Sequence, residues 1–367
     1  MSNLKIQMVD LKNQYLKIKP EIDSAIQKVI DSTQFIQGEA VHSFEEHIKN
    51  YMGCKFAIGC ASGTDALQIA MMALGIGQGD EIITTPFTFV ATTETIALLG
   101  AIPIYVDIDE RTYNIDANKI KSKITPRTKA IIPVHLYGQP AEMDKIKEIA
   151  KEYNLKVIED AAQSFGAIYR NKMVSTIGDI GCLSFFPSKN LGAYGDGGML
   201  TTDNEELANK IRMVSAHGSK KKYYHEILGV NSRLDSIQAA ILDVKLKYID
   251  EFGEARIQAS KKYNLRLDGN VVTPYVPQHV KHIFHQYSIR VNKRDELQLF
   301  LKENGIPSMI YYPVPLHLQN AYRYHYKEGD FPISEKISKD IISLPMHTEL
   351  TDEQIDYITE KVINFIH

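Results

Sequence analysis

Cysteine is scarce in this chain, which has three in 367 residues: Cys54, Cys60 and Cys182. An odd number without paired spacing argues against a disulfide framework, and no Cys-x-x-Cys pair is present to suggest a thiolate site. We therefore expect reduced, buried thiols, as in a cytoplasmic protein, and no bound metal.

Long apolar runs are also missing. The longest is too short to span a bilayer, and the N-terminal stretch MSNLKIQMVDLKNQY has no apolar core of a signal peptide. No sign of charge dominates, since 42 Lys and Arg against 45 Asp and Glu give a formal net charge of −3. Such a balance offers no attraction for nucleic acid or an acidic membrane surface. We expect a cytoplasmic protein that binds neither.

The segments that are present alternate between strand and helix patterns. Short apolar runs typical of strands lie at 56–60, 81–85, 102–107, 129–135, 155–160, 181–186 and 197–203. Helical patterns lie between the earlier runs, for example at 64–74 and 142–153. This alternation predicts an α/β fold with a mixed, mostly parallel sheet and helices on both faces.

The pattern changes after Leu234. Apolar residues then recur every three or four positions, at Ile237, Ile241, Val244, Tyr248 and Phe252. This period predicts one long amphipathic helix. Because single cores stop growing at about 250–300 residues, we expect a large domain over 1–250 and a small domain over 251–367. The small domain should contain a strand over 284–291, followed by a helix.

A carboxylate and a lysine stand at strand ends. Asp160 closes the buried run LKVIED, where ligands of open α/β sheets bind. It could hold a proton on a pyridine nitrogen, or simply cap a turn. Lys189 follows the next strand, 29 residues later, in the glycine-rich turn FPSKNLGAYGDGG. It could form a Schiff base, or be a solvated loop lysine.

A helix N-terminus and an aromatic pair complete the pattern. Ser62, Gly63 and Thr64 follow a strand and open a helix, where free amides and the helix dipole favour an anion; helix capping alone would use the same residues. Ser184 could add a hydroxyl for a phosphate. In TTPFTFVATTE, an aromatic ring could stack on a cofactor or pack in the core.

Taken together, several motifs resemble the DegT/DnrJ/StrS family of sugar aminotransferases. They are SGTDAL, PFTFVAT, VHLYG, VIEDAAQSFGA, SFFPSKNLGAYGDGG and GVNSRLDSIQAAIL. The resemblance runs from about Asp10 to the segment 343–347. It implies an aspartate-aminotransferase-like fold (fold type I) with a seven-stranded sheet, a smaller C-terminal α+β domain, and a homodimer whose active sites lie at the interface. It also implies pyridoxal 5′-phosphate, which becomes pyridoxamine 5′-phosphate in the half-reaction.

The resemblance also assigns roles. Lys189 would form the Schiff base and shuttle the proton, Asp160 would pair with the pyridinium nitrogen, and Gln163 would touch the ring hydroxyl. The other implied cofactor contacts are Gly63, Thr64 and Ser184 on the phosphate, Phe89 (rather than Phe87) on the ring, and Asn231 from the partner subunit. The implied lining of the sugar pocket is Arg233, Tyr311, Tyr312 and His317.

Glutamate and a nucleotide-linked keto sugar are the implied substrates, for amino sugar and polysaccharide biosynthesis. Related dehydratases replace the lysine or carry an iron–sulfur cluster, which typically needs four cysteines; neither condition fits this chain. The segment GIGQGD (75–80) follows a helix and precedes a strand, the reverse of a dinucleotide fingerprint, so we read it as a helix end and turn. A regulatory binder would not need a catalytic lysine.

The sugar itself is less defined by the sequence. The chain resembles the subgroup that aminates C3, which includes enzymes for dTDP-3-keto-6-deoxyhexoses and for UDP-2-acetamido-2-deoxy-3-keto-hexuronates. A uronate needs a cation for its carboxylate. Where the uronate enzymes carry a histidine, this chain has the neutral Tyr311, although Arg233 remains. We therefore expect a dTDP-3-amino-3,6-dideoxyhexose as product, with the uronate reaction as the alternative.

Overall fold

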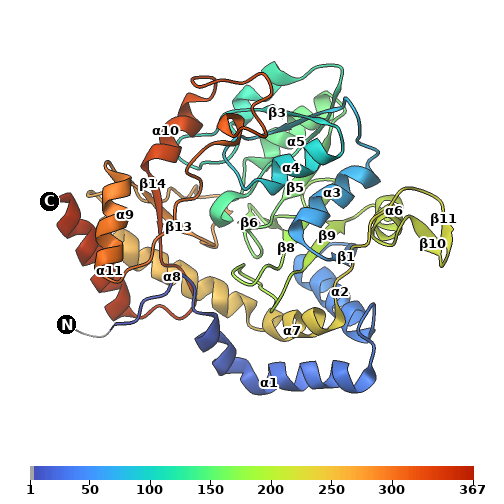
Figure 1. The fold of residues 1–367 in the computed structure, drawn as a ribbon, viewed down its shortest axis with the longest axis horizontal. Coiled ribbons are helices and arrows are strands. Elements are labelled where there is room, and N and C mark those ends of the chain that lie inside the picture. The colour runs from blue at the N-terminus through green and yellow to red at the C-terminus, as the bar shows by residue number, and fades with distance from the viewer. Residues whose placement is uncertain (1–3) are drawn as a thin grey trace.

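A seven-stranded sheet forms the centre of the computed structural model, which describes residues 4–367 (Figure 1). Its order is β1-β9-β8-β5-β4-β2-β3. The strands are β1 (Phe56–Cys60), β2 (Glu81–Thr84), β3 (Ile102–Tyr105), β4 (Thr128–Ile131), β5 (Lys156–Asp160), β8 (Ile180–Ser184) and β9 (Gly198–Thr202). Only β9 is reversed in this sheet, since it pairs antiparallel with β1 and β8. The predicted mixed, mostly parallel sheet is confirmed.

Helices cover both faces of the sheet. They are α2 (Glu39–Met52), α3 (Gly63–Ala73), α4 (Ala91–Leu98), α5 (Met143–Glu152), α6 (Glu205–Ser215) and α7 (Ser236–Leu246), while α1 (Leu11–Ser32) packs on the outer side of α7. Successive strand residues point to opposite faces: Val157 joins the core under α2, α5 and α7, whereas Ile158 joins the core under α3, α4 and α6. Because both faces are buried, the strands are continuous apolar runs.

The C-terminal part has a core of its own, apart from the sheet (Figure 1). Its elements are α8 (Ile249–Leu267), α9 (Arg294–Glu303), α10 (Pro332–Asp340), α11 (Asp352–Ile366), β13 (Tyr287–Arg290) and β14 (Ile341–Leu344). The boundary that we propose near residue 250 falls at the start of α8. Ile6 also packs into this core, so the chain's first described residues contact its last helices.

The long helix predicted after Leu234 is two helices, which corrects the sequence analysis. α7 ends at Leu246 and α8 begins at Ile249, because Tyr248 leaves helical geometry with φ −105° and ψ 2°. The apolar period continues across the break, and the side chains of Tyr248 and Phe252 still stack. Periodicity alone could not reveal the break, since α7 packs on the sheet domain and most of α8 on the C-terminal core.

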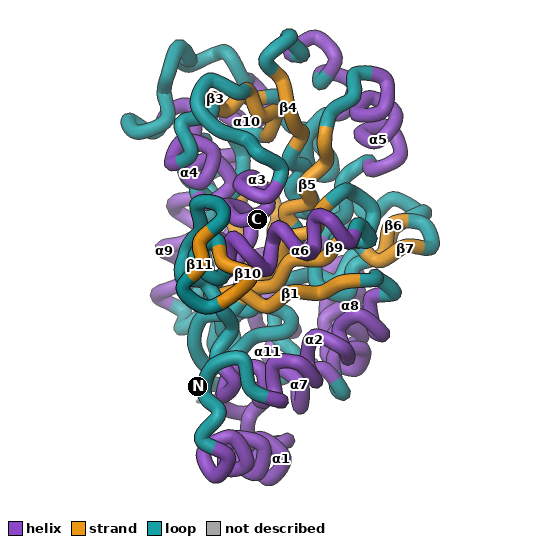
Figure 2. Tube along the Cα trace, turned by 90° about the vertical axis from the view of Figure 1, so that its right-hand side faces the viewer, coloured by secondary structure: helices purple, strands orange, loops and turns teal. Residues whose placement is uncertain are grey.

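Small elements connect these parts. They are the strands β6 (Ile168–Tyr169), β7 (Lys172–Met173), β10 (Ser219–Lys221), β11 (Tyr224–His225) and β12 (Val280–Lys281), and the 3-10 turns η1 (Ala117–Lys119), η2 (Lys121–Lys123), η3 (Leu136–Gly138) and η4 (Leu316–Leu318). The β10–β11 hairpin stands out from the body on the right of Figure 1, on the side that faces the viewer in Figure 2. Across residues 4–367, no helix is both long and apolar enough to cross a membrane.

Candidate active site

A cavity of about 440 Å³ lies at the carboxyl ends of β5 and β8. The predicted residues that line it are Gly63, Thr64, Phe89, Asp160, Gln163, Ser184, Lys189, Tyr311 and Tyr312. All but the two tyrosines come from the part of the chain that forms the sheet and its helices, and the tyrosines enter from the C-terminal part. The fold therefore brings together residues that are spread over some 250 positions of sequence.

Three predicted residues lie outside this cavity. Asn231 is exposed and accepts a hydrogen bond from Arg233, at 2.5 Å between Nη2 and Oδ1. His317 is fully buried: its Nε2 lies 2.9 Å from Glu335 Oε1, and its ring packs on Phe331. The structure therefore does not bring His317 to the cavity, because the Pro-rich turn that carries it is held against the segment after β2 by the bond from the Leu316 amide to the Pro86 carbonyl.

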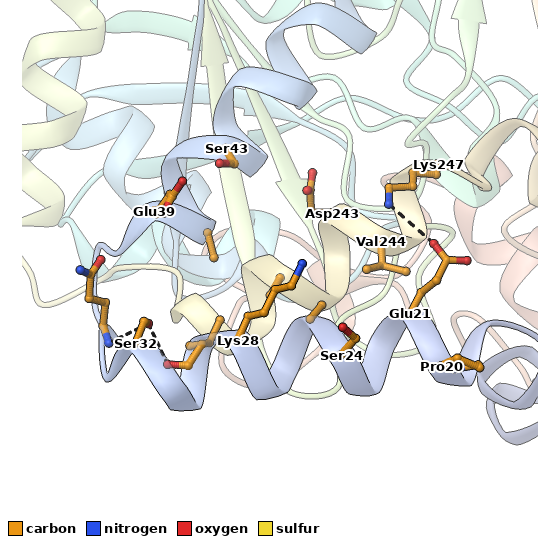
Figure 3. A pocket seen from close by; sticks show the side chains of 15 residues that line it. Pro20, Glu21, Ser24, Lys28, Ser32, Glu39, Ser43, Asp243, Val244 and Lys247 are labelled. Atoms are coloured by element: carbon orange, nitrogen blue, oxygen red, sulfur yellow. Dashed lines mark hydrogen bonds and ion pairs between the residues drawn. The ribbon is translucent and has the colours of Figure 1, made fainter.

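A larger cavity, of about 670 Å³, lies elsewhere, between α1, α2 and α7 (Figure 3). Its lining mixes both charge signs: Glu21 and Lys247 pair across it at 3.6 Å, near Lys28 and Asp243. Of the residues that the structure describes, no aromatic side chain and none that the sequence predicts for catalysis lines this cavity. Size alone therefore does not identify the reactive site of this protein.

Asp160 ends β5 and is buried. Thr92 Oγ1 donates to its Oδ2 at 2.8 Å, and the Ala162 amide donates to its Oδ1 at 3.2 Å. Burial raises the pKa of this carboxyl, while these hydrogen bonds and the charge of Lys189 act in the opposite direction. A cation that enters the cavity would favour the ionised form further.

Lys189 sits in the turn after β8, where its amide donates to the Phe186 carbonyl at 2.8 Å. Burial lowers the pKa of its amine to about 8, although the nearby Asp160 carboxylate opposes that shift. The lowered pKa makes a neutral, nucleophilic amine available near neutral pH, which Schiff-base chemistry requires. The solvated-loop reading of Lys189 does not fit this environment.

The N-terminus of α3 forms one wall. Ser62 caps the helix, since its hydroxyl accepts from the Asp65 amide at 3.0 Å. The first amides of a helix have no partner within it. Gly63 packs so closely on β8 that a Cβ there would lie 2.6 Å from the Cβ of Ser184. Glycine thus lets the helix start approach Ser184, and together they form a cup that suits a phosphate.

Gln163 and Phe89 also line the cavity. The Gln163 side chain accepts from the Tyr137 amide at 2.7 Å and donates to the Tyr312 hydroxyl at 3.0 Å. Phe89 is 55% exposed and lines the cavity, whereas Phe87 is fully buried. This difference favours Phe89 as the ring that could stack on a ligand, with Phe87 packing in the core.

Sequence reasoning missed several polar residues that also line the cavity, among them His285 and Gln286. The predicted strand over 284–291 begins only at Tyr287, so these residues stand before it and face the site. Burial holds the pKa of His285 well below its ordinary value, with the charges of Lys189 and Arg256 acting in the same direction. The only available sequence signal was a polar pair that opens an apolar run.

The donor set fits pyridoxal 5′-phosphate. A phosphorylated pyridine aldehyde needs a site for its phosphate, a surface for its ring, an acid for its nitrogen and an amine for its aldehyde. One cavity offers all four, in the N-terminus of α3 with Ser184, the Phe89 ring, the buried Asp160 carboxylate and the Lys189 amine. A metal would need different groups, and residues 4–367 contain no cluster of three or more His, Cys, Asp or Glu side chains able to hold one.

Comparison with known sequences gives one family. The profile of the DegT/DnrJ/EryC1/StrS aminotransferase family matches residues 16–363. A "Pleiotropic regulatory protein" of Geobacillus stearothermophilus is 51% identical over 99% of each chain. A UDP-2-acetamido-2-deoxy-3-oxo-D-glucuronate aminotransferase of Pseudomonas aeruginosa is 47% identical, over 98% of this chain and 100% of that protein. A dTDP-3-amino-3,6-dideoxy-alpha-D-galactopyranose transaminase of Aneurinibacillus thermoaerophilus is 43% identical, over 97% and 98%.

Solved structures of aminotransferases also match this chain. The chain matches Streptomyces venezuelae DesV, solved in complex with a ketimine intermediate, with a TM-score of 0.97 and 37% identity over 99% of each chain. It matches Bacillus subtilis NtdA, solved with bound cofactor PMP, with a TM-score of 0.92 and 32% identity, over 100% of this chain and 87% of that one.

Proposed function

Because the chain belongs to the DegT/DnrJ/EryC1/StrS aminotransferase family, we propose that it transfers an amino group to C3 of a nucleotide-linked 3-keto sugar. Glutamate is the proposed amino donor. The chain is a pyridoxal-phosphate-dependent sugar aminotransferase with the aspartate-aminotransferase-like fold. The observation that carries the proposal is that Lys189, Asp160 and the N-terminus of α3 line the same cavity, with the pKa of Lys189 lowered there.

When bound, pyridoxal 5′-phosphate supplies an aldehyde that takes up the amino group and a ring that withdraws electrons from the reacting carbon. Gly63, Thr64 and Ser184 would hold the phosphate, and Phe89 would cover the ring. Asp160 would face the ring nitrogen, where its charge keeps a proton. Gln163 would contact the ring hydroxyl through its amide.

Lys189 has a second task once its amine is free. Its Nζ would remove the proton from the glutamate carbon that bears nitrogen, and it would return a proton to C3 of the sugar in the other half-reaction. A single base can serve both carbons because both pass through the same cavity. An amine whose pKa is lowered to about 8 can accept and release a proton near neutral pH.

We expect the capture of pyridoxal phosphate by the cofactor-free protein to depend on pH. The folded pKa of Lys189 is about 8, so the amine is protonated below that value and neutral above it. The capture rate should rise about tenfold per pH unit below 8 and level off above it. Stopped-flow absorbance of the cofactor's visible band between pH 6 and pH 10 measures this. A rate that keeps rising up to pH 10, as for an ordinary lysine with a pKa of 10.5, would contradict the lowered pKa.

Two finer proposals for the sugar differ in nucleotide and in charge. The UDP-hexuronate reaction is favoured by similarity, at 47% identity against 43% for the dTDP-sugar relative. The dTDP-3-keto-6-deoxyhexose reaction is favoured by the cavity, since among residues 4–367 Lys189 is the one lysine or arginine in its lining and Tyr311 is neutral. We rank the UDP-linked sugar first. It requires Arg233 of a partner subunit to bind the carboxylate.

We also propose a homodimer with shared active sites. Its support is the position of Asn231 and Arg233, which lie outside the cavity of their own chain, on the segment that follows the exposed β10–β11 hairpin. The three cysteines are free and buried, in keeping with our proposal of a cytoplasmic enzyme.

The reverse half-reaction tests the function and the sugar together. Enzyme loaded with pyridoxal phosphate is mixed with a UDP-linked 3-amino-hexuronate or, separately, with a dTDP-3-amino-3,6-dideoxyhexose, and the visible band is followed. Loss of the band with the uronate alone supports the first candidate, and loss with the dTDP sugar alone supports the second. If neither sugar changes the band while glutamate does, amination at C3 of these sugars is excluded.

A further inference from the structure

Tyr137 has an unusual backbone. It lies in η3, after β4, with φ 60° and ψ 7°, which is the left-handed region. Residues with a Cβ rarely adopt this conformation, and a bulky one costs free energy to hold there. The side chain is nevertheless buried, with 3% of its surface exposed. Surrounding contacts must therefore hold this residue in place.

Every polar group of Tyr137 contacts a residue of the cavity. Its amide donates to Gln163 Oε1 at 2.7 Å, and its carbonyl accepts from the Gln286 amide at 3.3 Å. Its hydroxyl donates to the carbonyl of Tyr311. These partners come from three separate segments: the turn after β5, the segment before β13, and the tyrosine turn 311–312. One residue thus links both domains around the cavity.

The left-handed conformation of Tyr137 places its polar groups where they can form these hydrogen bonds. The next residue, Gly138, also has a positive φ, of 95°, and a Cβ there would lie 3.0 Å from the His285 amide nitrogen. The turn therefore brings Tyr137 against the segment that carries His285 and Gln286. The Tyr137 amide also fixes the Gln163 side chain, because an accepting Oε1 leaves Nε2 to donate to Tyr312.

We propose that Tyr137 is a positioning residue that aligns Tyr311 and Tyr312, which line the proposed sugar pocket, with the cofactor-binding residues. Its amide orients Gln163, and its hydroxyl holds the turn 311–312 over the same cavity. The proposal rests on the proposed function, in which Tyr311 and Tyr312 line the sugar pocket. The two bonds use different groups of Tyr137. A change that removes only the hydroxyl should therefore weaken binding of the sugar and leave binding of the cofactor unchanged.

The test is Tyr137→Phe, which keeps the ring and the backbone amide. With pyridoxal phosphate bound, we expect the visible spectrum, the cofactor affinity and the glutamate half-reaction to stay within about twofold of wild type. We expect KM for the amino sugar to rise about tenfold or more, since the Tyr311 carbonyl loses its hydrogen-bond partner. Equal losses in both half-reactions would show a merely structural role and overturn the proposal.

Tyr113→Phe is the matched control. Tyr113 is also buried, packs edge-on against Tyr137 with ring centroids 6.2 Å apart, and has its hydroxyl beside Arg290 rather than the turn. This variant should leave both half-reactions unchanged.

A second readout needs no sugar. Hydrogen exchange of the cofactor-loaded protein should be faster in the peptide containing 309–313 for Tyr137→Phe, and unchanged for Tyr113→Phe. Unchanged exchange in Tyr137→Phe would overturn the proposal. If wild type converts neither amino sugar, the proposed function fails, while the exchange result still decides whether Tyr137 holds the turn.

Discussion

Replacement of Lys189 by methionine is expected to abolish transamination and, at the same time, to stabilise the cofactor-free protein. The variant loses both the Schiff-base amine and the base that moves the proton, so kcat should fall by at least about 10⁴-fold. Methionine fills a similar volume and carries no charge. Absorbance should show no covalent capture of pyridoxal phosphate.

The stability gain follows from the lysine's pKa. Burial lowers it from 10.5 to about 8, so the folded protein holds the proton less well than the unfolded chain does. Below pH 8 the amine is protonated in both states, and its burial destabilises the fold by up to about 3 kcal/mol. Between pH 8 and 10.5 this destabilisation fades. The gain for Lys189→Met should therefore be largest at pH 7 and absent above about pH 10.5.

Urea unfolding of the cofactor-free protein at pH 7 and pH 10.5 measures this gain. Lys147→Met is the control, because Lys147 is an exposed lysine on the outer face of α5. It should change the free energy of unfolding by less than about 0.5 kcal/mol. A loss of stability in Lys189→Met, or retained turnover, would contradict the assignment of Lys189.

Replacement of Asp160 by asparagine should slow both half-reactions by about 10²- to 10³-fold without preventing covalent capture of the cofactor. Asparagine can still accept from the Ala162 amide and can donate through its own amide nitrogen to Thr92 Oγ1, but it has no charge to hold a proton on the ring nitrogen. Lys189 is unchanged, so the amine still reacts with the aldehyde. Single-turnover absorbance with glutamate measures the loss.

The neighbouring Glu159→Gln is a stringent control. Glu159 is also fully buried, but it faces the opposite side of β5, where it accepts from the amides of Ser175, Ile177 and Gly178 and lies 3.0 Å from His135. We expect its loss to lower the free energy of unfolding by about 1–3 kcal/mol. The glutamate half-reaction should stay within a few-fold of wild type. Equal rate losses in the two variants would refute a specific role for the Asp160 charge.

Much of the scaffold could be read from local patterns. All seven runs that the sequence marks as strands enter the central sheet, because buried strands need continuous apolar residues. The start of α3 was also visible, since Ser62 is a helix-capping residue directly after a strand. Asp160 and Lys189 could be nominated because strand ends meet at one edge of such a sheet.

Other features depended on contacts between distant segments. The break between α7 and α8 leaves the apolar period intact, so no pattern signals it. His317 was grouped with Tyr311 and Tyr312 because it is near them in sequence, yet its ring is buried against Glu335. His285 and Gln286 reach the cavity only because the C-terminal part packs against the turn at Gly138.

The sequence by itself determined the family, the sheet, and the lysine and carboxylate that define the chemistry, because these rest on local periodicity and on motifs in a fixed order. Only the tertiary structure decided which side chains share the cavity, how far burial lowers the pKa of Lys189, and that Tyr137 joins three of its segments. The physical reason is that burial and hydrogen-bond partners belong to pairs of distant residues. A left-handed backbone at a tyrosine is stable only once those partners are in place.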